Sequence, residues 1–269
     1  MRSAMLEALT LTTESASPTA PALPVVWTSA QWVAYFRHNL ANLLPIPWEH
    51  GEISQQEYDD VIASLRSWQI GETSDGSHLL RTAQRYAEKA NDPAFVDAIK
   101  LFIGEEQRHG ETLGRFLDLV SVPRKTRDWG ELLFRTCRHA LLRVESNASV
   151  IVMVEVHALL YYAAVRRATS SPVLRQVCCQ LLRDEVPHIR FQCERLAMLH
   201  RGRNRVFRAI TLGAHRAFFT ALTLAVWFGH GRTLRAGGLT FRRYWRHAWT
   251  QMGKAWRTMD PRAYSWPTP

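Results

Sequence analysis

Apolar residues recur every three or four positions along most of the chain, and no segment shows the strict alternation of a half-buried strand. The pattern predicts an all-α protein. Helices are expected at about 30–44, 54–90, 93–120, 128–168, 172–199, 204–228 and 241–259, and several of them begin or end at proline. The four long helices in the middle predict two hairpins that pack as an antiparallel four-helix bundle, with additional helices at both ends.

Three positions are expected to disturb this regularity. Gly71 and Gly76 each weaken the second helix by about 1 kcal/mol relative to alanine, which predicts a local irregularity. The polar stretch 146–149 predicts an interruption of the fourth helix. Pro187 removes a backbone donor inside the fifth, which predicts a kink or a π-bulge there.

Composition and charge divide the chain into three parts. Residues 1–24 are rich in Ser, Thr, Ala and Pro and predict a disordered tail without the apolar segment of a secretory signal. Residues 25–200 hold the predicted bundle with its short leading helix at 30–44. Residues 201–269 form a basic, Trp-rich extension expected to pack on the bundle: they contain thirteen Lys or Arg and one acid, a charge of +12. The whole chain carries +10, so the remainder carries −2.

The basic extension is where we expect an acidic partner or carrier protein to bind. Trp245, Trp249 and Trp256 lie on one stripe of the last helix. That stripe either meets a membrane surface or an acidic protein, or covers the core of the bundle itself; membrane contact is the less favoured alternative. No nucleic-acid-binding motif accompanies the charge, so nucleic acid is not an expected partner.

The redox state and location follow from cysteines and hydropathy. Cys137, Cys178, Cys179 and Cys193 fall inside helical patterns and form no Cys-x-x-Cys pair, which predicts reduced thiols. No run of about 18 apolar residues free of charge is present, the nearest being 217–229. We therefore expect a cytoplasmic protein.

Two predicted helices carry the motif Glu-x-x-His, as Glu106–His109 and Glu185–His188. Residues three apart on a helix project from the same face. Both motifs continue the apolar stripe of their helix, so both point into the predicted core. A buried carboxylate is costly unless it is paired or binds a metal.

The two partner helices each add a glutamate at the same depth. Glu155 and Glu185 lie equally far from the turn at Ser170, and Glu72 and Glu106 lie equally far from a turn near Lys89. Antiparallel hairpins therefore bring four glutamates and two histidines to one level. Carboxylate oxygen with imidazole nitrogen suits a pair of iron or manganese ions, and Asp75 is the alternative to Glu72.

These motifs resemble those of the ferritin-like di-iron carboxylate superfamily. The run Glu105-Glu106-Gln107-Arg108-His109-Gly110 resembles the EENRHG box of acyl-carrier-protein desaturases, and Asp184-Glu185-x-x-His188 resembles their DExxH box. The order E, ExxH, E, ExxH is also similar to that of rubrerythrins, although this sequence has no Cys-x-x-Cys iron site. The match covers about residues 69–196.

The resemblance implies roles for further residues and for a cofactor. A metal-bound imidazole usually donates its other N–H to a carboxylate, which implies that Asp184 supports His109 and Glu105 supports His188. Tyr162, beside Glu155, is a candidate for redox chemistry, with core packing the simpler expectation. The implied cofactors are two iron ions, or iron with manganese, and dioxygen is the implied co-substrate.

Two functions remain open at this point. The leading hypothesis is an O2-dependent oxidoreductase acting on an organic substrate, with an electron donor protein as partner and with no catalytic residues beyond the metal ligands. The alternative is a metal-handling protein such as a ferroxidase, a peroxide scavenger or an iron-binding protein. A homodimer is expected only because symmetric assemblies are common.

Overall fold

The structure is a computed structural model that describes residues 23–49, 52–73, 76–126 and 143–266. Within these residues it is all-helical, which confirms the expected fold class, and its one extended pairing is an isolated bridge. The helices are α2 (Ser29–Ala41), α3 (Gln55–Glu57), the π-helix η1 (Tyr58–Ile62), α4 (Ala63–Glu72), α5 (Ser77–Ala90), α6 (Pro93–Leu119), α8 (Val144–Ala168), α9 (Pro172–Leu199), α10 (Arg205–Ala236), α11 (Phe241–Thr258) and the 3-10 turn η2 (Pro261–Ala263). The predicted tail falls almost wholly on residues 1–22, outside the described residues.

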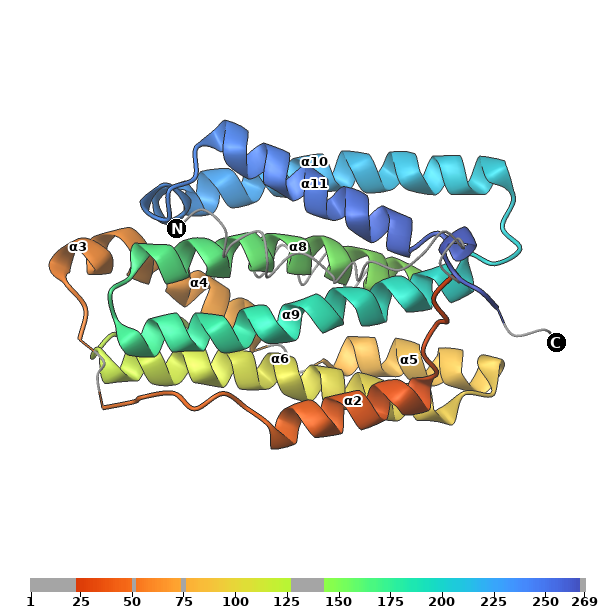
Figure 1. Ribbon diagram of the computed structural model, residues 1–269, viewed down its shortest axis with the longest axis horizontal. Helices are drawn as coiled ribbons and strands as arrows, with labels where there is room; N and C mark the ends of the chain where they lie inside the picture. The colour runs from red at the N-terminus through yellow and green to blue at the C-terminus, as the bar shows by residue number, and fades with distance from the viewer. Residues whose placement is uncertain (1–22, 50–51, 74–75, 127–142, 267–269) are drawn as a thin grey trace, which may run out of the picture.

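The helices are arranged in layers (Figure 1). Helices α8 and α9 pack against each other along their length, and α6 contacts α9, α4 and α5. Helix α2 lies across α6 at one side of the molecule. Helices α10 and α11 form an outer layer at the opposite side, where α10 packs on α8 and α11 packs on both α8 and α9.

Local sequence explains where several helices begin. Pro93 and Pro172 occupy the first helical turn of α6 and α9, where a missing N–H costs nothing. Side chains of Thr28, Ser171 and Asn204 accept hydrogen bonds from backbone N–H groups at the starts of α2, α9 and α10. These capping residues fix the ends of the helices that surround the core.

The long second helix of the sequence prediction is divided. Helix α4 ends at Glu72, and α5 begins at Ser77 after Gly76, whose φ of 66° is a left-handed conformation that favours glycine. The irregularity expected from the glycines is therefore present. Residues 74–75, including the alternative ligand Asp75, lie outside the described residues.

The interruption expected at 146–149 is absent. Helix α8 runs through these residues, where Ser146 and Asn147 donate hydrogen bonds to the carbonyl of Arg143 and Ser149 donates to that of Glu145. No π-bulge occurs at Pro187 either: α9 is α-helical throughout, and it packs on α8 along its length. The π-helix lies instead at residues 58–62.

One predicted helix end also differs. Helix α10 continues to Ala236 rather than ending near residue 228, because its final turns are buried through Thr233 and Leu234. The segment 127–142, where the fourth predicted helix would start, lies outside the described residues, and Cys137 lies there too. Cys178, Cys179 and Cys193 are free thiols.

Two apolar clusters make up the core. One joins α4, α8, α9, α10 and α11, and the half-buried Trp249 and Trp256 of α11 pack against it. The tryptophan stripe of α11 thus covers the protein's own core. The second cluster joins α2, α5, α6, α8 and α9 and includes Phe36, Phe102 and Phe191.

The segments near the two ends of the described chain lie together. Val25 and Ser265 form a parallel bridge, and the backbone N–H of Ser265 donates to the carbonyl of Pro24 at 3.1 Å. The Ser265 hydroxyl donates to the carbonyl of Leu23 at 2.9 Å. The strand-like segment before α2 is thereby fixed against the segment that follows η2.

Candidate metal centre

The six side chains expected to bind metal come from four helices and meet inside the protein. Glu72 is the last residue of α4, Glu106 and His109 lie on α6, Glu155 lies on α8, and Glu185 and His188 lie on α9. Two groups have candidate ligand atoms that all lie within 4.8 Å of one another: Glu106 with Glu155, Glu185 and His188, and Glu72 with Glu106 and His109. Glu106 belongs to both groups, so the two groups are adjacent.

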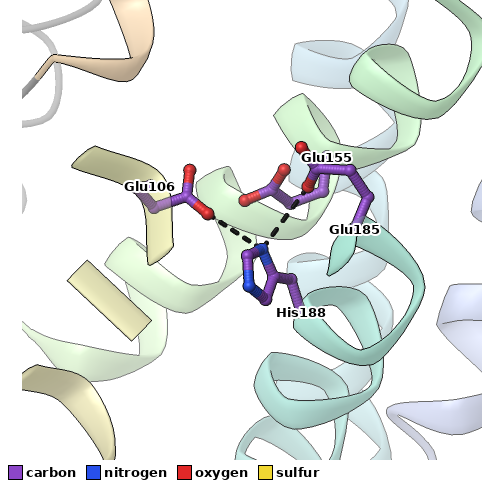
Figure 2. A group of neighbouring side chains, drawn as sticks. All are labelled: Glu106, Glu155, Glu185 and His188. Atoms are coloured by element: carbon purple, nitrogen blue, oxygen red, sulfur yellow. Dashed lines mark ion pairs between the residues drawn. The ribbon is translucent and has the colours of Figure 1, made fainter. Parts of the chain in front are cut away.

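Both histidine rings face the carboxylates through Nδ1, and Figure 2 shows this for His188. His188 Nδ1 lies 2.8 Å from Glu106 Oε1 and 3.5 Å from Glu185 Oε2. His109 Nδ1 lies 3.6 Å from the other oxygen of Glu185, Oε1. Glu185 therefore lies between the two imidazoles.

Several atoms at the centre are buried and make no hydrogen bond. They are Nδ1 of His109 and both carboxylate oxygens of Glu185, while His188 Nδ1 and Glu106 Oε1 have only each other as partners, at 2.8 Å. Buried polar atoms in proteins are almost always satisfied, and unsatisfied ones signal a missing ion or water or a functional role. The atoms left without partners are the nitrogen and oxygen atoms that a divalent cation would bind, so these buried groups could hold a metal ion.

The carboxylates of the cluster lie so close together that they shift one another's pKa values. Burial and the charges of Glu106 and Glu185 raise the pKa of both Glu72 and Glu155 well above its usual value. Burial also disfavours the charge of Glu106, but His188 outweighs it and lowers that pKa. Like charges at this separation repel strongly in a dry interior, and a bound cation would remove that repulsion.

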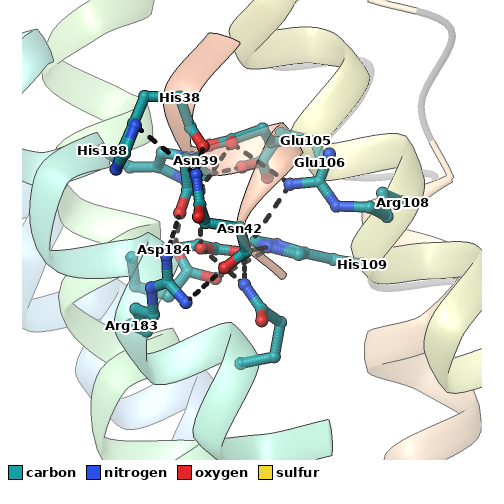
Figure 3. Close-up of polar contacts among 12 residues, drawn as sticks. His38, Asn39, Asn42, Glu105, Glu106, Arg108, His109, Arg183, Asp184 and His188 are labelled. Carbon is teal, nitrogen blue, oxygen red and sulfur yellow. Dashed lines mark hydrogen bonds and ion pairs between the residues drawn. The ribbon is translucent and has the colours of Figure 1, made fainter. Parts of the chain in front are cut away.

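Each imidazole is held from behind by a carboxylate (Figure 3). His109 Nε2 lies 3.0 Å from Asp184 Oδ2, and His188 Nε2 lies 2.8 Å from Glu105 Oε2. These are the pairs that the resemblance implies. Because the carboxylates engage Nε2, both rings keep Nδ1 turned toward the cluster.

Asn39 of α2 joins the two supporting carboxylates, a role that sequence reasoning missed. Its side-chain amide donates to Glu105 Oε1 at 2.7 Å and to Asp184 Oδ1 at 2.8 Å. Gln180 also donates to Asp184, at 2.9 Å. Burial opposes the charge of Asp184, but hydrogen bonds from His109, Asn39 and Gln180 outweigh it and lower its pKa below the usual range.

Arginines complete the support. Arg108 Nη2 lies 3.1 Å from Glu105 Oε1, and Arg183 donates through Nη2 to Asn39 Oδ1 at 3.0 Å. The leading helix is thus part of the site rather than an appendage. The sequence does carry a signal for this role of Asn39. It follows Trp32 and Phe36 at helical spacing, so a polar residue occupies the buried face of α2 where an apolar one would be expected.

Glu72 is positioned by two contacts. The Tyr162 hydroxyl donates to Glu72 Oε1 at 2.6 Å, which gives this tyrosine a hydrogen-bonding role beside the cluster. The end of α4 also lies tightly on Gly110 of α6: a β-carbon at Gly110 would come within 3.2 Å of the Glu72 carbonyl carbon. The glycine after His109 therefore permits the close approach that brings Glu72 to the other ligands.

Several other acids and histidines lie away from the cluster. Glu145, on α8 like Glu155, pairs with His200 at 3.2 Å. His157 is buried between Thr223 and Tyr244, and His230 lies 2.8 Å from the Ser64 hydroxyl. His215 lines a cavity beside α10.

Comparisons of the chain with protein-family models, with curated proteins and with solved structures find no match.

Proposed function

We propose that this protein is a ferritin-like non-haem di-iron protein and that it acts as an O2-dependent oxidoreductase. The observation that carries the proposal is the buried cluster of four glutamates and two histidines, in which His109 Nδ1 and both oxygens of Glu185 make no hydrogen bond. In this proposal α4 with α5, α6, α8 and α9 are the four helices of an antiparallel bundle, and each contributes to the cluster.

The donor set fits two ions of iron, or of iron and manganese. The ligands would be Glu72, Glu106, His109, Glu155, Glu185 and His188; Glu106 belongs to both groups, and Glu185 lies near both histidines. Two such ions, when bound, supply the redox chemistry by which proteins reduce dioxygen. The protein's own part is to fix the ligands in advance and to exclude water.

The side chains around the cluster perform that part. Asp184 and Glu105 hold the Nε2 protons of the two imidazoles and so fix which nitrogen faces inward. Phe102 packs edge-on against His188 at 4.7 Å between ring centroids and keeps its face dry. Glu106, with a side chain 18% exposed, is the ligand nearest to solvent, and its position marks where small molecules would enter.

The alternative is a metal-handling protein without an organic substrate. Both proposals need the same ligands, and they differ in what consumes dioxygen. A ferroxidase oxidises successive ferrous ions as its substrate, whereas an oxygenase or oxidase keeps its two ions and draws electrons from a donor protein. Turnover therefore separates them.

The test begins with anaerobic ferrous titration of the purified protein. We expect about two ions per chain, and we expect the Glu106→Gln, Glu185→Gln double variant to bind neither. Glutamine keeps the shape and removes charge from a repulsive cluster, so this variant should fold at least as stably as the wild type. The matched control is Glu145→Gln, a change on α8 away from the cluster that should leave binding intact.

Oxygen uptake by the loaded protein then distinguishes the functions. One uptake event per pair of ions, renewed only when a reductant is added, supports the oxidoreductase and justifies a substrate search. Continued uptake with excess ferrous ion alone supports metal handling. Failure of the wild type to bind iron, manganese or cobalt would rule out both proposals.

A further inference from the structure

Helix α10 presents an uncharged apolar face to the outside of the molecule. Phe219, Thr223, Val226 and Leu234 are buried on its inner side. On the outer side, between residues 206 and 229, every exposed position except Arg216 is apolar or glycine. The exposed positions of this outer face are Val206, Ala209, Ile210, Gly213, Ala214, Ala217, Phe218, Ala221, Ala225, Phe228 and Gly229. At 1.5 Å per residue the face is about 33 Å long.

The exposure of its large side chains is high. Phe228 is 81% exposed, and Val206 and Ile210 are each 68% exposed. Single exposed apolar residues are ordinary, but a continuous apolar face of this length marks a surface that binds something. In Figure 1, α10 lies in the outermost layer, so no other described helix covers this face.

Helix α10 is as apolar in composition as a helix that is surrounded by apolar groups. Both α8 and α10 are long and apolar enough to cross a membrane by length and composition. The most apolar window of α8 is 83% buried inside the protein, whereas that of α10 is only 17% buried. The apolar side chains of α8 are buried in the core, whereas most of those of α10 are not.

Positive charge surrounds the outer face. Arg205 precedes it, Arg232 and Arg235 follow it, and Arg216 lies at its edge. Exposed Arg242, Arg243 and Arg246 lie on the neighbouring α11. The one acid after residue 200, Asp260, is engaged by Arg208 at 2.8 Å and by Arg262 at 2.6 Å.

A cavity of about 560 Å³ opens beside the first turns of α10. It is lined by Arg205, His215 and Trp256, and also by Asp260 with its ion-pair partners Arg208 and Arg262.

We propose that the outer face of α10 docks on the surface of a membrane that contains anionic lipids. The apolar side chains would enter the boundary between headgroups and acyl chains while the flanking arginines contact lipid phosphates. The same strip on a second copy carries the same positive charge, which disfavours a symmetric dimer through this face.

Helix α10 docks on the surface without crossing the membrane, because it is fastened to the rest of the protein along its length. Thr233 donates to the carbonyl of Asp60 at 2.7 Å, and Thr223 lies 3.3 Å from the buried His157. Crossing a bilayer would require these contacts and the packing on α8 to be broken.

The test is co-sedimentation of the full-length protein with vesicles, with or without metal. We expect binding to vesicles of phosphatidylcholine mixed with phosphatidylglycerol, weak binding to phosphatidylcholine alone, and loss of binding in about 0.5 M salt. The Ile210→Gln, Phe218→Gln, Phe228→Gln variant should bind roughly tenfold or more weakly. Replacing Arg205, Arg216 and Arg235 by Gln should weaken binding by about fivefold per residue.

A matched control carries the same chemical change elsewhere. Leu40 of α2, Leu43 just after α2 and Leu119 of α6 are exposed by 50%, 40% and 42% and lie away from α10, so their triple change to glutamine should leave vesicle binding unaltered. Circular dichroism verifies that all variants fold. Equal binding by the face variant and the wild type would overturn the proposal.

Two further results would also overturn it. Concentration-dependent dimerisation that the face variant abolishes, without vesicle binding, would assign the face to a second copy. Resistance of vesicle-bound protein to extraction with alkaline carbonate would show a spanning helix. Because vesicle binding needs no metal, failure here leaves the proposed di-iron function untouched.

Discussion

Gly110→Ala tests the close packing that positions Glu72. A β-carbon at this position would lie 2.8 Å from Thr73 Cγ2 and 3.2 Å from the backbone carbon of Glu72, so the end of α4 must move away by several tenths of an ångström. Forcing extra volume into a packed contact costs about 1–3 kcal/mol. Alanine in place of glycine inside a helix returns about 1 kcal/mol. The expected net loss of unfolding free energy is therefore about 0–2 kcal/mol.

Gly104→Ala supplies the control on the same helix. A β-carbon there meets nothing within 4 Å, so only the helix-propensity gain remains and the variant should be about 1 kcal/mol more stable than the wild type. Urea unfolding measures both variants. The difference between them isolates the packing cost, about 1–3 kcal/mol.

Metal binding gives a second measurement of the same displacement. Moving the end of α4 shifts Glu72 away from Glu106 and His109. Gly110→Ala should therefore weaken the binding of one of the two ions, whereas Gly104→Ala should leave the binding of both unchanged. Cobalt titration, followed by visible absorption, reports each ion. If Gly110→Ala proves as stable as Gly104→Ala and binds two ions equally well, α4 does not rest on Gly110 as described.

Three further predictions concern single hydrogen-bonding groups. Asn39→Leu should lower the unfolding free energy in urea by about 1–3 kcal/mol and weaken cobalt binding about 10–100-fold, because Glu105 and Asp184 each lose a hydrogen-bond donor. Unchanged cobalt affinity would refute the positioning role of Asn39. Tyr162→Phe leaves a Glu72 oxygen without its donor and should cost about 1–3 kcal/mol, measured the same way, whereas a neutral effect would contradict the contact. Burial raises the pKa of Glu57, but hydrogen bonds from Ser54 and Ser170 outweigh it and lower the pKa to about 2. The resulting stabilisation is present above pH ~4.5 and is lost as pH falls through 2. Glu57→Gln should therefore lower the unfolding free energy by about 1 kcal/mol at neutral pH and flatten the acid-unfolding curve, and an unchanged curve would contradict this.

The sequence predicted the cluster well because its residues obey helical periodicity. Glu106 with His109 and Glu185 with His188 each share a helix face, and counting residues from the turns placed the partner glutamates at the same depth. Their convergence needed only straight helices and short turns. Their role as metal ligands remains a prediction.

Features that depend on tertiary packing were harder to predict. The docking of α2, and with it Asn39, depends on contacts with helices far along the chain, which a periodic pattern does not encode. A π-bulge was one expectation at Pro187, but α9 stays α-helical there while it packs on α8. The stretch 146–149 was expected to break a helix because its polar side chains favour turns, whereas here they bond to the helix's own carbonyls.

The position of α2 has a consequence for how the chain folds during synthesis. Asn39 is synthesised 145 residues before its partner Asp184. Leu23 is likewise synthesised 242 residues before Ser265, which contacts it. Closing such distant contacts is slow, and domains otherwise tend to fold from the N-terminus as they emerge. Helix α2 is therefore among the last helices to dock, and its apolar face with Trp32 and Phe36 stays exposed until α9 is complete. During that interval this helix is the segment that chaperones would have to shield.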